Sequence, residues 1–146
     1  MKRTFFFLLF FSITFLAKAQ LGKIPAAVTD AFAARYPHAT HVEWHDKLHN
    51  YVAHFKLNSC IIMASFSSKG EWQGSERELE FSQLPGEVKD GFSKSKYAGR
   101  EKKAAFEVQE LGKPLRYRIN VQKSGIQKKN LYFDVNGRLL KESITL

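Results

Sequence analysis

Two stretches of this sequence share one pattern: IPAAVTDAF at residues 24–32 and LPGEVKDGF at residues 84–92, which start 60 positions apart. In both, a proline in the second position is followed by apolar residues at helical spacing. Proline is favoured in the first turn of a helix, and this spacing puts the apolar side chains on one face. Each stretch therefore predicts a short amphipathic helix, and Pro37 predicts where the first helix stops.

A second pair of matching stretches lies 67 positions apart: ASFSSKGEW at residues 64–72 and LYFDVNGRL at residues 131–139. Both place a glycine four residues after a phenylalanine. The Asn-Gly pair at residues 136–137 is a strong signal for a two-residue hairpin, and Ser-Lys-Gly at residues 68–70 takes the equivalent place. The chain therefore contains an internal repeat of two copies. The increase in spacing from 60 to 67 positions predicts longer loops in the second copy.

Between each helix and its hairpin, apolar and polar residues alternate, which predicts half-buried β-strands. The clearest runs have apolar residues at positions 51, 53, 55 and 57 and at positions 115, 117, 119 and 121. The pattern gives one helix and about four strands per copy. We expect an α+β fold of two tandem α-β4 repeats, with helices on one face of an antiparallel sheet and a polar, open face opposite.

Core and turn residues of both copies form a set of motifs: Ile24-Pro25-x-x-Val28-x-x-x-Phe32, Tyr36-Pro37-x-Ala39, Val42-x-Trp44, Tyr51-x-x-x-Phe55, Phe66-x-x-x-Gly70-x-Trp72 and FDVNGRL at residues 133–139. With them the chain resembles the secreted PepSY-like family, which is similar to the β-lactamase-inhibitor protein. The resemblance covers nearly all of residues 22–145. It implies a tandem α-β4 arrangement with a continuous, slightly concave sheet surface, and binding or inhibition of other proteins, chiefly envelope enzymes.

The chain departs from that inhibitor at its cysteines. The inhibitor is braced by disulfides, whereas this chain has Cys60 as its one cysteine and can form no internal disulfide. No residue here matches the inhibitor's contact set, so the resemblance implies no binding residue and no action on a lactamase.

The first 19 residues predict an export signal. Lys2 and Arg3 precede an apolar run at residues 5–17, and Ala-Lys-Ala at residues 17–19 is a small-x-small cleavage site. The run is too short for a transmembrane anchor, so no membrane span is expected after cleavage. We expect an exported protein of the periplasm or the extracellular space. Residues 20–146 would form a single domain, with repeat one at about 22–83 and repeat two at about 84–146.

Charge is divided unequally between the copies. Residues 20–83 carry a net charge of −1, and residues 84–146 carry +7. Arg116 and Arg118 share one strand face; with Trp72 they are the candidate partner-binding residues, because aromatic and arginine side chains often anchor interfaces. The basic residues of the second copy could form a docking surface for an acidic protein, an anionic glycan or lipid headgroups. Alternatively, they form an ordinary solvated face, or they pair with the glutamates at positions 76, 78 and 80 of the first copy. Trp72 could instead belong to the core.

All five histidines fall between residues 38 and 54. If Val42 and Trp44 face the core, four side chains share the open face: His41, Glu43, His45 and His54. Imidazoles with a carboxylate suit zinc or copper, so these residues are a candidate metal site. The alternatives are a pH-responsive surface and an ordinary polar strand face.

No sequence motif of a catalytic site is present, so we expect no enzyme, and an exported chain is not expected to bind nucleic acid. The sequence favours an exported, non-catalytic binding module that inhibits or modulates an envelope or secreted enzyme such as a peptidase. One alternative is a small-ligand or transition-metal-binding periplasmic module that uses the histidine-rich hairpin. Another is a structural subunit of an envelope complex.

Overall fold

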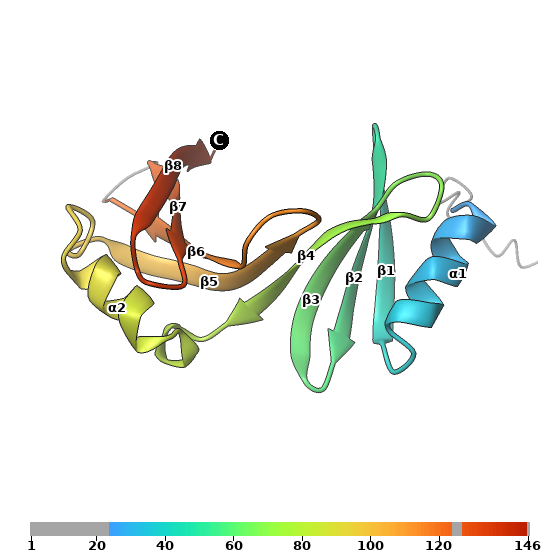
Figure 1. Cartoon of the computed structure of the whole chain (residues 1–146), viewed down its shortest axis with the longest axis horizontal. Helices are drawn as coiled ribbons and strands as arrows, with labels where there is room; N and C mark the ends of the chain where they lie inside the picture. Colours follow the sequence, from blue (N-terminus) through green and yellow to red (C-terminus); the bar gives the residue numbers. More distant parts are fainter. Residues whose placement is uncertain (1–23, 124–126, 146) are drawn as a thin grey trace, which may run out of the picture.

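The computed structural model describes residues 24–123 and 127–145, so the predicted export signal lies outside the described residues. One antiparallel sheet of eight strands, in the order of the chain, runs through the molecule with a helix near either end (Figure 1). In the described residues, no helix is long and apolar enough to cross a membrane. The elements are α1 (Ala26–Arg35), β1 (Thr40–Lys47), β2 (Asn50–Leu57), β3 (Cys60–Phe66), β4 (Trp72–Leu79), the 3₁₀ turn η1 (Phe81–Gln83), α2 (Gly86–Ser93), β5 (Glu101–Glu110), β6 (Arg116–Gln122), β7 (Lys128–Asp134) and β8 (Leu139–Thr145).

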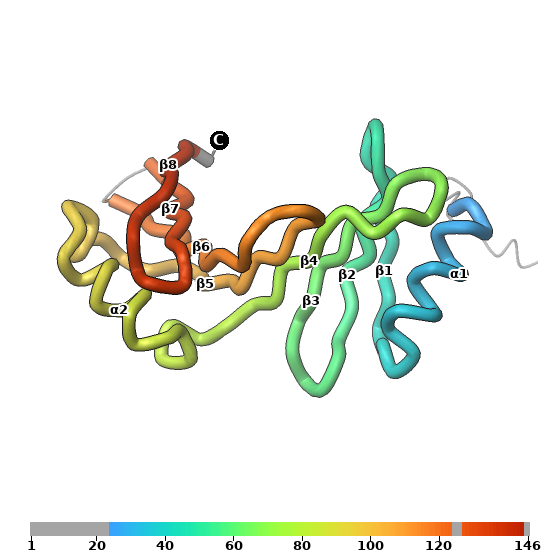
Figure 2. Tube along the Cα trace, viewed as in Figure 1, coloured from blue at the N-terminus to red at the C-terminus, as the bar shows by residue number. Residues whose placement is uncertain are grey.

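The predicted α+β fold is confirmed. Copy one, which comprises α1 and β1–β4, and copy two, which comprises α2 and β5–β8, follow one another along the chain path (Figure 2). Each helix begins directly after its proline, at Ala26 and at Gly86, as the sequence predicts. The first helix ends at Arg35, two residues before Pro37.

Each helix buries its apolar face against the strands of its own copy. Val28 and Phe32 of α1 pack into one core, and Val88 and Phe92 of α2 pack into another. Both cores lie on the same face of the sheet. Residues that are directly opposite one another on neighbouring strands share a face, and a continuous row of such residues leads from the first core to the second. This row runs through Ile62, Arg77, Glu107, Tyr117 and Phe133.

A polar strip separates the two cores on the helix-covered face. Its central contact is the ion pair between Arg77 and Glu107, with 3.0 Å between Nη2 and Oε2. The two helices therefore do not share a core, and the pairing of β4 with β5 joins the copies.

The hairpin glycines explain why the Phe-x-x-x-Gly motif is repeated. Gly70 and Gly137 have φ angles of +84° and +79°, which residues with a side chain rarely adopt. Each glycine also lies against the helix of its copy, where an added Cβ would collide with the backbone carbonyl of Ala27 or of Glu87. Glycine is thus required both by the turn and by the approach of the hairpin to the helix.

We expect Gly137→Ala to lower the free energy of unfolding by about 2 kcal/mol or more, because it combines left-handed backbone strain with a steric clash. Gly70→Ala should behave similarly. The matched control is Gly112→Ala, because Gly112 has φ +71° and no atom within 4 Å of an added Cβ. Urea unfolding measures all three variants. Equal losses in Gly112→Ala and Gly137→Ala would show that the approach to the helix does not constrain the hairpin.

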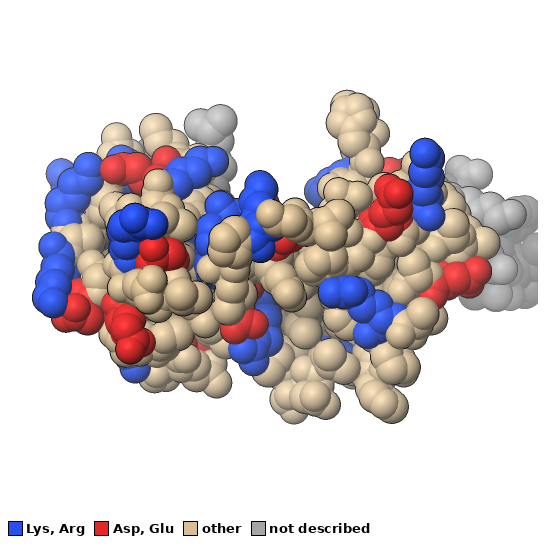
Figure 3. Space-filling model, in the orientation of Figure 1, with Lys and Arg blue, Asp and Glu red and all other residues tan. Residues whose placement is uncertain are grey.

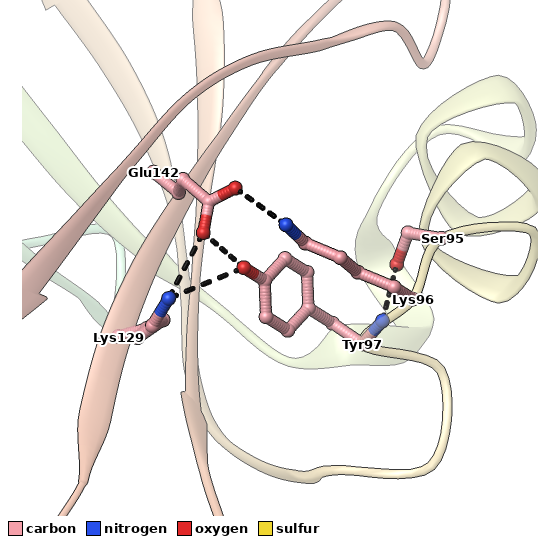
Figure 4. A network of polar contacts seen from close by, with 5 residues as sticks. All are labelled: Ser95, Lys96, Tyr97, Lys129 and Glu142. Atoms are coloured by element: carbon pink, nitrogen blue, oxygen red, sulfur yellow. Dashed lines mark hydrogen bonds and ion pairs between the residues drawn. The ribbon is translucent and has the colours of Figure 1, made fainter.

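A polar network fastens the loop after α2 to the last two strands (Figure 4). The Tyr97 hydroxyl donates a hydrogen bond to Oε2 of Glu142. Lys129 Nζ lies 3.0 Å from the same oxygen, and Lys96 Nζ lies 3.0 Å from Oε1. The hydrogen bond from Tyr97, together with those from Lys129 and Lys96, lowers the pKa of Glu142 from its usual value near 4.5 to about 2.

We expect Glu142→Gln to lower the free energy of unfolding at neutral pH and to reduce its fall between pH 4.5 and about 2. The folded-state pKa is the lower one, so the unfolded chain binds the proton first and stability is lost as the pH falls through this window. Denaturant unfolding across that range is the measurement. Glu87→Gln, at an exposed position of α2, is the control for the removal of one carboxylate.

Candidate partner-binding face

The face of the sheet opposite the helices, called the open face below, is covered by no helix of the described chain. The register assigns a cross-sheet row of side chains to it at the junction of the copies. In the space-filling view the outline dips between the two ends, and Lys and Arg side chains gather over copy two (Figure 3). The row consists of Glu76 on β4, Phe106, Val108 and Glu110 on β5, Arg116 and Arg118 on β6, and Tyr132 on β7.

Two arginine–glutamate ion pairs order the centre of the open face. Arg118 Nη2 lies 2.6 Å from Oε2 of Glu76, which belongs to copy one, and Arg116 pairs with Glu110. The Arg118 guanidinium crosses β5 and stacks over Phe106, with Cζ 4.2 Å from the ring centroid. The alternative in which acids of copy one pair with basic residues of copy two is thus confirmed at Glu76.

These ion pairs are largely withdrawn from water. The side chains of Arg118 and Glu76 are 15% and 28% exposed. Burial raises the pKa of Glu76, although the nearby Arg118 charge opposes the rise. The hydrogen bond from Lys113, helped by the charge of Arg116, lowers the pKa of Glu110. Half-buried, paired arginines are held in place, so their planar groups are preorganised for a partner.

A groove of about 350 Å³ lies beside the ion pairs and draws on both copies. Apolar side chains from β2, β3 and β5, namely Val52, Met63 and Val108, line it. Gly74 contributes no side chain, and a Cβ there would lie 2.8 Å from the carbonyl oxygen of Gln109. Glu76 and Glu110 stand at its polar margin. The groove can accept an apolar side chain of a partner within a charged surround, the pattern expected of an interface anchor.

The structure places the candidate partner-binding residues on different faces. Arg116 and Arg118 share the open face, as predicted, but both are engaged in ion pairs rather than free. Trp72 lies on the helix-covered face, where it packs against the copy-one core under Arg35, whose Cζ is 4.0 Å from its ring. Trp72 therefore does not share the open face with the arginines, and its side chain packs against the core on the other side of the sheet, which is the alternative that the sequence left open for it.

The candidate metal site is only partly assembled. The rings of His45 and His54 lie 4.3 Å apart, and Glu43 is directly opposite His54. Burial, and then the charge of His45, lowers the pKa of His54. His41 has φ +53° at a bulge of β1, which interrupts the two-residue alternation that the prediction assumed. Among residues 24–123 and 127–145, no three His, Cys, Asp or Glu side chains are placed to hold a metal ion.

Sequence reasoning missed the groove. Val52, Met63 and Val108 are apolar residues at positions where the alternation calls for polar ones, and this was the available signal. The signal was not decisive, because isolated apolar residues are common on protein surfaces. Only the register of four strands shows that the three side chains meet.

The tandem repeat, the continuous sheet and the open face can now be compared with known proteins. Residues 49–141 match the family model described as "Putative beta-lactamase-inhibitor-like, PepSY-like". The chain belongs to this PepSY-like family. No curated protein matches it.

Solved structures share the PepSY-like fold. A BLIP-like protein from Bacteroides fragilis is 27% identical with a TM-score of 0.77, and the match covers 85% of this chain and 89% of that one. A protein from Bacteroides eggerthii, described as "putative periplasmic", is 23% identical with a TM-score of 0.79 and coverages of 84% and 90%. A DUF2874 family protein from Bacteroides ovatus is 24% identical with a TM-score of 0.79 and coverages of 84% and 88%.

A double-mutant cycle tests the central ion pair of this PepSY-like protein. We expect Glu76→Gln and Arg118→Met each to cost about 1–3 kcal/mol of unfolding free energy, because each leaves a half-buried charged partner unpaired. The double variant should cost less than the sum of the two. The control is the same cycle on Asp90 of α2 and Lys94, the residue that follows α2. Their side chains are 57% and 74% exposed and should be coupled by less than about 0.5 kcal/mol. Equal coupling in both cycles would contradict a special role for the pair.

Proposed function

We propose that this PepSY-like protein is an exported, non-catalytic binding module that holds a protein partner on its open face at the junction of the copies. The observation that carries the proposal is the groove lined by Val52, Met63 and Val108 beside the ordered pair of Arg118 and Glu76. An apolar pocket next to held arginines combines the two features that concentrate binding energy in protein interfaces.

The partner proposed is an envelope or secreted enzyme, such as a peptidase, which the protein inhibits or modulates. The family description and the BLIP-like structure from Bacteroides fragilis support the comparison with an inhibitor. Export is supported by the signal pattern at residues 1–19 and by the description of the Bacteroides eggerthii protein. Catalysis is not part of the proposal, because among the described residues no hydrogen bond joins a serine or cysteine of the open face to a histidine, and Ser65 accepts its hydrogen bond from Asn50.

Site-specific photo-cross-linking in the envelope of the source organism tests this function. A photoreactive residue at Met63 lies in the groove, and one at Ala34 lies on the exposed side of α1. We expect one dominant protein to be cross-linked from position 63 and not from position 34. Val52→Arg should weaken binding of that protein about tenfold or more, since it fills the groove with a charge, whereas Ala34→Arg should not.

Rate measurements on the purified partner then distinguish an inhibitor or modulator from a structural subunit. A change in its enzymatic rate that is lost with Val52→Arg supports an inhibitor or modulator. Cross-links at fixed stoichiometry without any change of rate would instead support a structural subunit. Cross-linking that is equal from both positions, or stronger from position 34, would contradict the use of the open face.

A further inference from the structure

A second cavity, of about 430 Å³, opens on copy two and is lined by Lys103, Asn120, Val121, Gln122 and Lys128. Asn120 and Gln122 follow Arg118 on β6 at intervals of two residues, so their side chains lie on the same open face as Arg118. Lys128 of β7 is directly opposite Gln122 and shares that face. The groove described above adjoins Glu110, at the other end of β5. The cavity is therefore separate from the proposed protein-binding site, and we call it the lysine cavity.

Two lysines, Lys103 and Lys128, line the lysine cavity. Lys103 pairs with Glu101 at 2.6 Å. The two side chains are 44% and 64% exposed, so the pair contributes little and leaves the ammonium group able to turn toward a ligand. The neighbouring Lys102 and Lys129 belong to the helix-covered face, because both are opposite the buried Val121.

Asn120 supplies an independent feature of the lysine cavity. Its Oδ1 atom is buried and accepts no hydrogen bond from the described residues. A buried acceptor without a donor is destabilising, and native proteins rarely keep one without a reason. The ammonium groups attract an anion, whereas Oδ1 needs a donor. A ligand that fits both carries a negative charge and a hydrogen-bond donor close together, as a phosphate beside a hydroxyl does.

We propose that the lysine cavity binds a phosphate group with a neighbouring hydroxyl. Lys103 and Lys128 would donate hydrogen bonds to the phosphate oxygens, and the ligand hydroxyl would donate to Asn120 Oδ1. Phosphate is preferred because lysine binds it well as a point charge, and the cavity has room for a small hydroxylated group beside it. The same chemistry occurs in free glycerol phosphate and in the headgroup of phosphatidylglycerol.

The test uses these two probes with the purified protein. Glycerol 3-phosphate is titrated by calorimetry, with glycerol and sulfate as ligands that each lack one of the two features, since glycerol has no charge and sulfate has no hydroxyl at neutral pH. Vesicle flotation compares phosphatidylcholine with phosphatidylcholine containing phosphatidylglycerol. We expect saturable binding of glycerol 3-phosphate that is tighter than binding of either control ligand, or flotation that requires phosphatidylglycerol. The first result assigns a free ligand and the second a membrane headgroup.

Variants matched for charge separate a site from general attraction to anions. Lys103→Gln with Lys128→Gln should weaken binding about tenfold or more. Lys69→Gln with Lys94→Gln removes the same charge from exposed positions elsewhere and should leave binding within about twofold. Asn120→Leu keeps every charge, and it should weaken binding while the melting temperature stays level or rises, because the unpaired acceptor is gone.

Two outcomes would overturn the proposal. One is the absence of saturable binding to both probes. The other is binding that falls equally in the two double-lysine variants and is unaffected by Asn120→Leu, since that result describes the overall charge of the protein rather than a site. Melting temperatures of all variants exclude misfolding as the cause, and Asn120→Leu keeps the test valid if the lysine variants are unstable.

Discussion

The ladder between β4 and β5 is the interaction on which the rest of this structure depends. It pairs six residues of copy one with six of copy two, from Gly74 opposite Glu110 to Leu79 opposite Ala105. The two apolar cores do not merge, so this backbone pairing, with the side chains that cross it, unites the copies. The open face is continuous because the ladder is, and both its groove and its Arg118–Glu76 pair span the ladder.

The two faces of the β4–β5 ladder carry different sets of side chains. On the helix-covered face the Arg77–Glu107 pair fills the gap between the cores, where no helix lies above the strands. On the open face the same strands present a buried phenylalanine, Phe106, beneath the guanidinium of Arg118. Charged side chains therefore lie on both sides of the junction, and those of the open face adjoin a groove with an apolar lining. This difference is why the open face, rather than the helix side, is proposed as the binding surface.

The sequence was informative wherever structure follows from neighbours along the chain. The prolines before Ala26 and Gly86 located both helix starts, and the repeated glycines located both hairpins. The alternation assigned Arg116 and Arg118 to one face correctly. The same reasoning failed at His41, where a bulge breaks the two-residue period, and it left two environments open for Trp72, whose type suits an interface and a core equally. A bulge has no reliable local signal, and a tryptophan's environment depends on what packs above it.

The α+β class, the two α-β4 copies and the polar or apolar character of most strand positions follow from local sequence, because proline placement, turn residues and periodicity act over a few residues. Which charges meet depends instead on how the strands pair. Arg118 and Glu76 are 42 positions apart, and Arg77 and Glu107 are 30 apart. Their contact depends on the register between copies, because a shift of one residue would place the two members of each pair on opposite faces of the sheet.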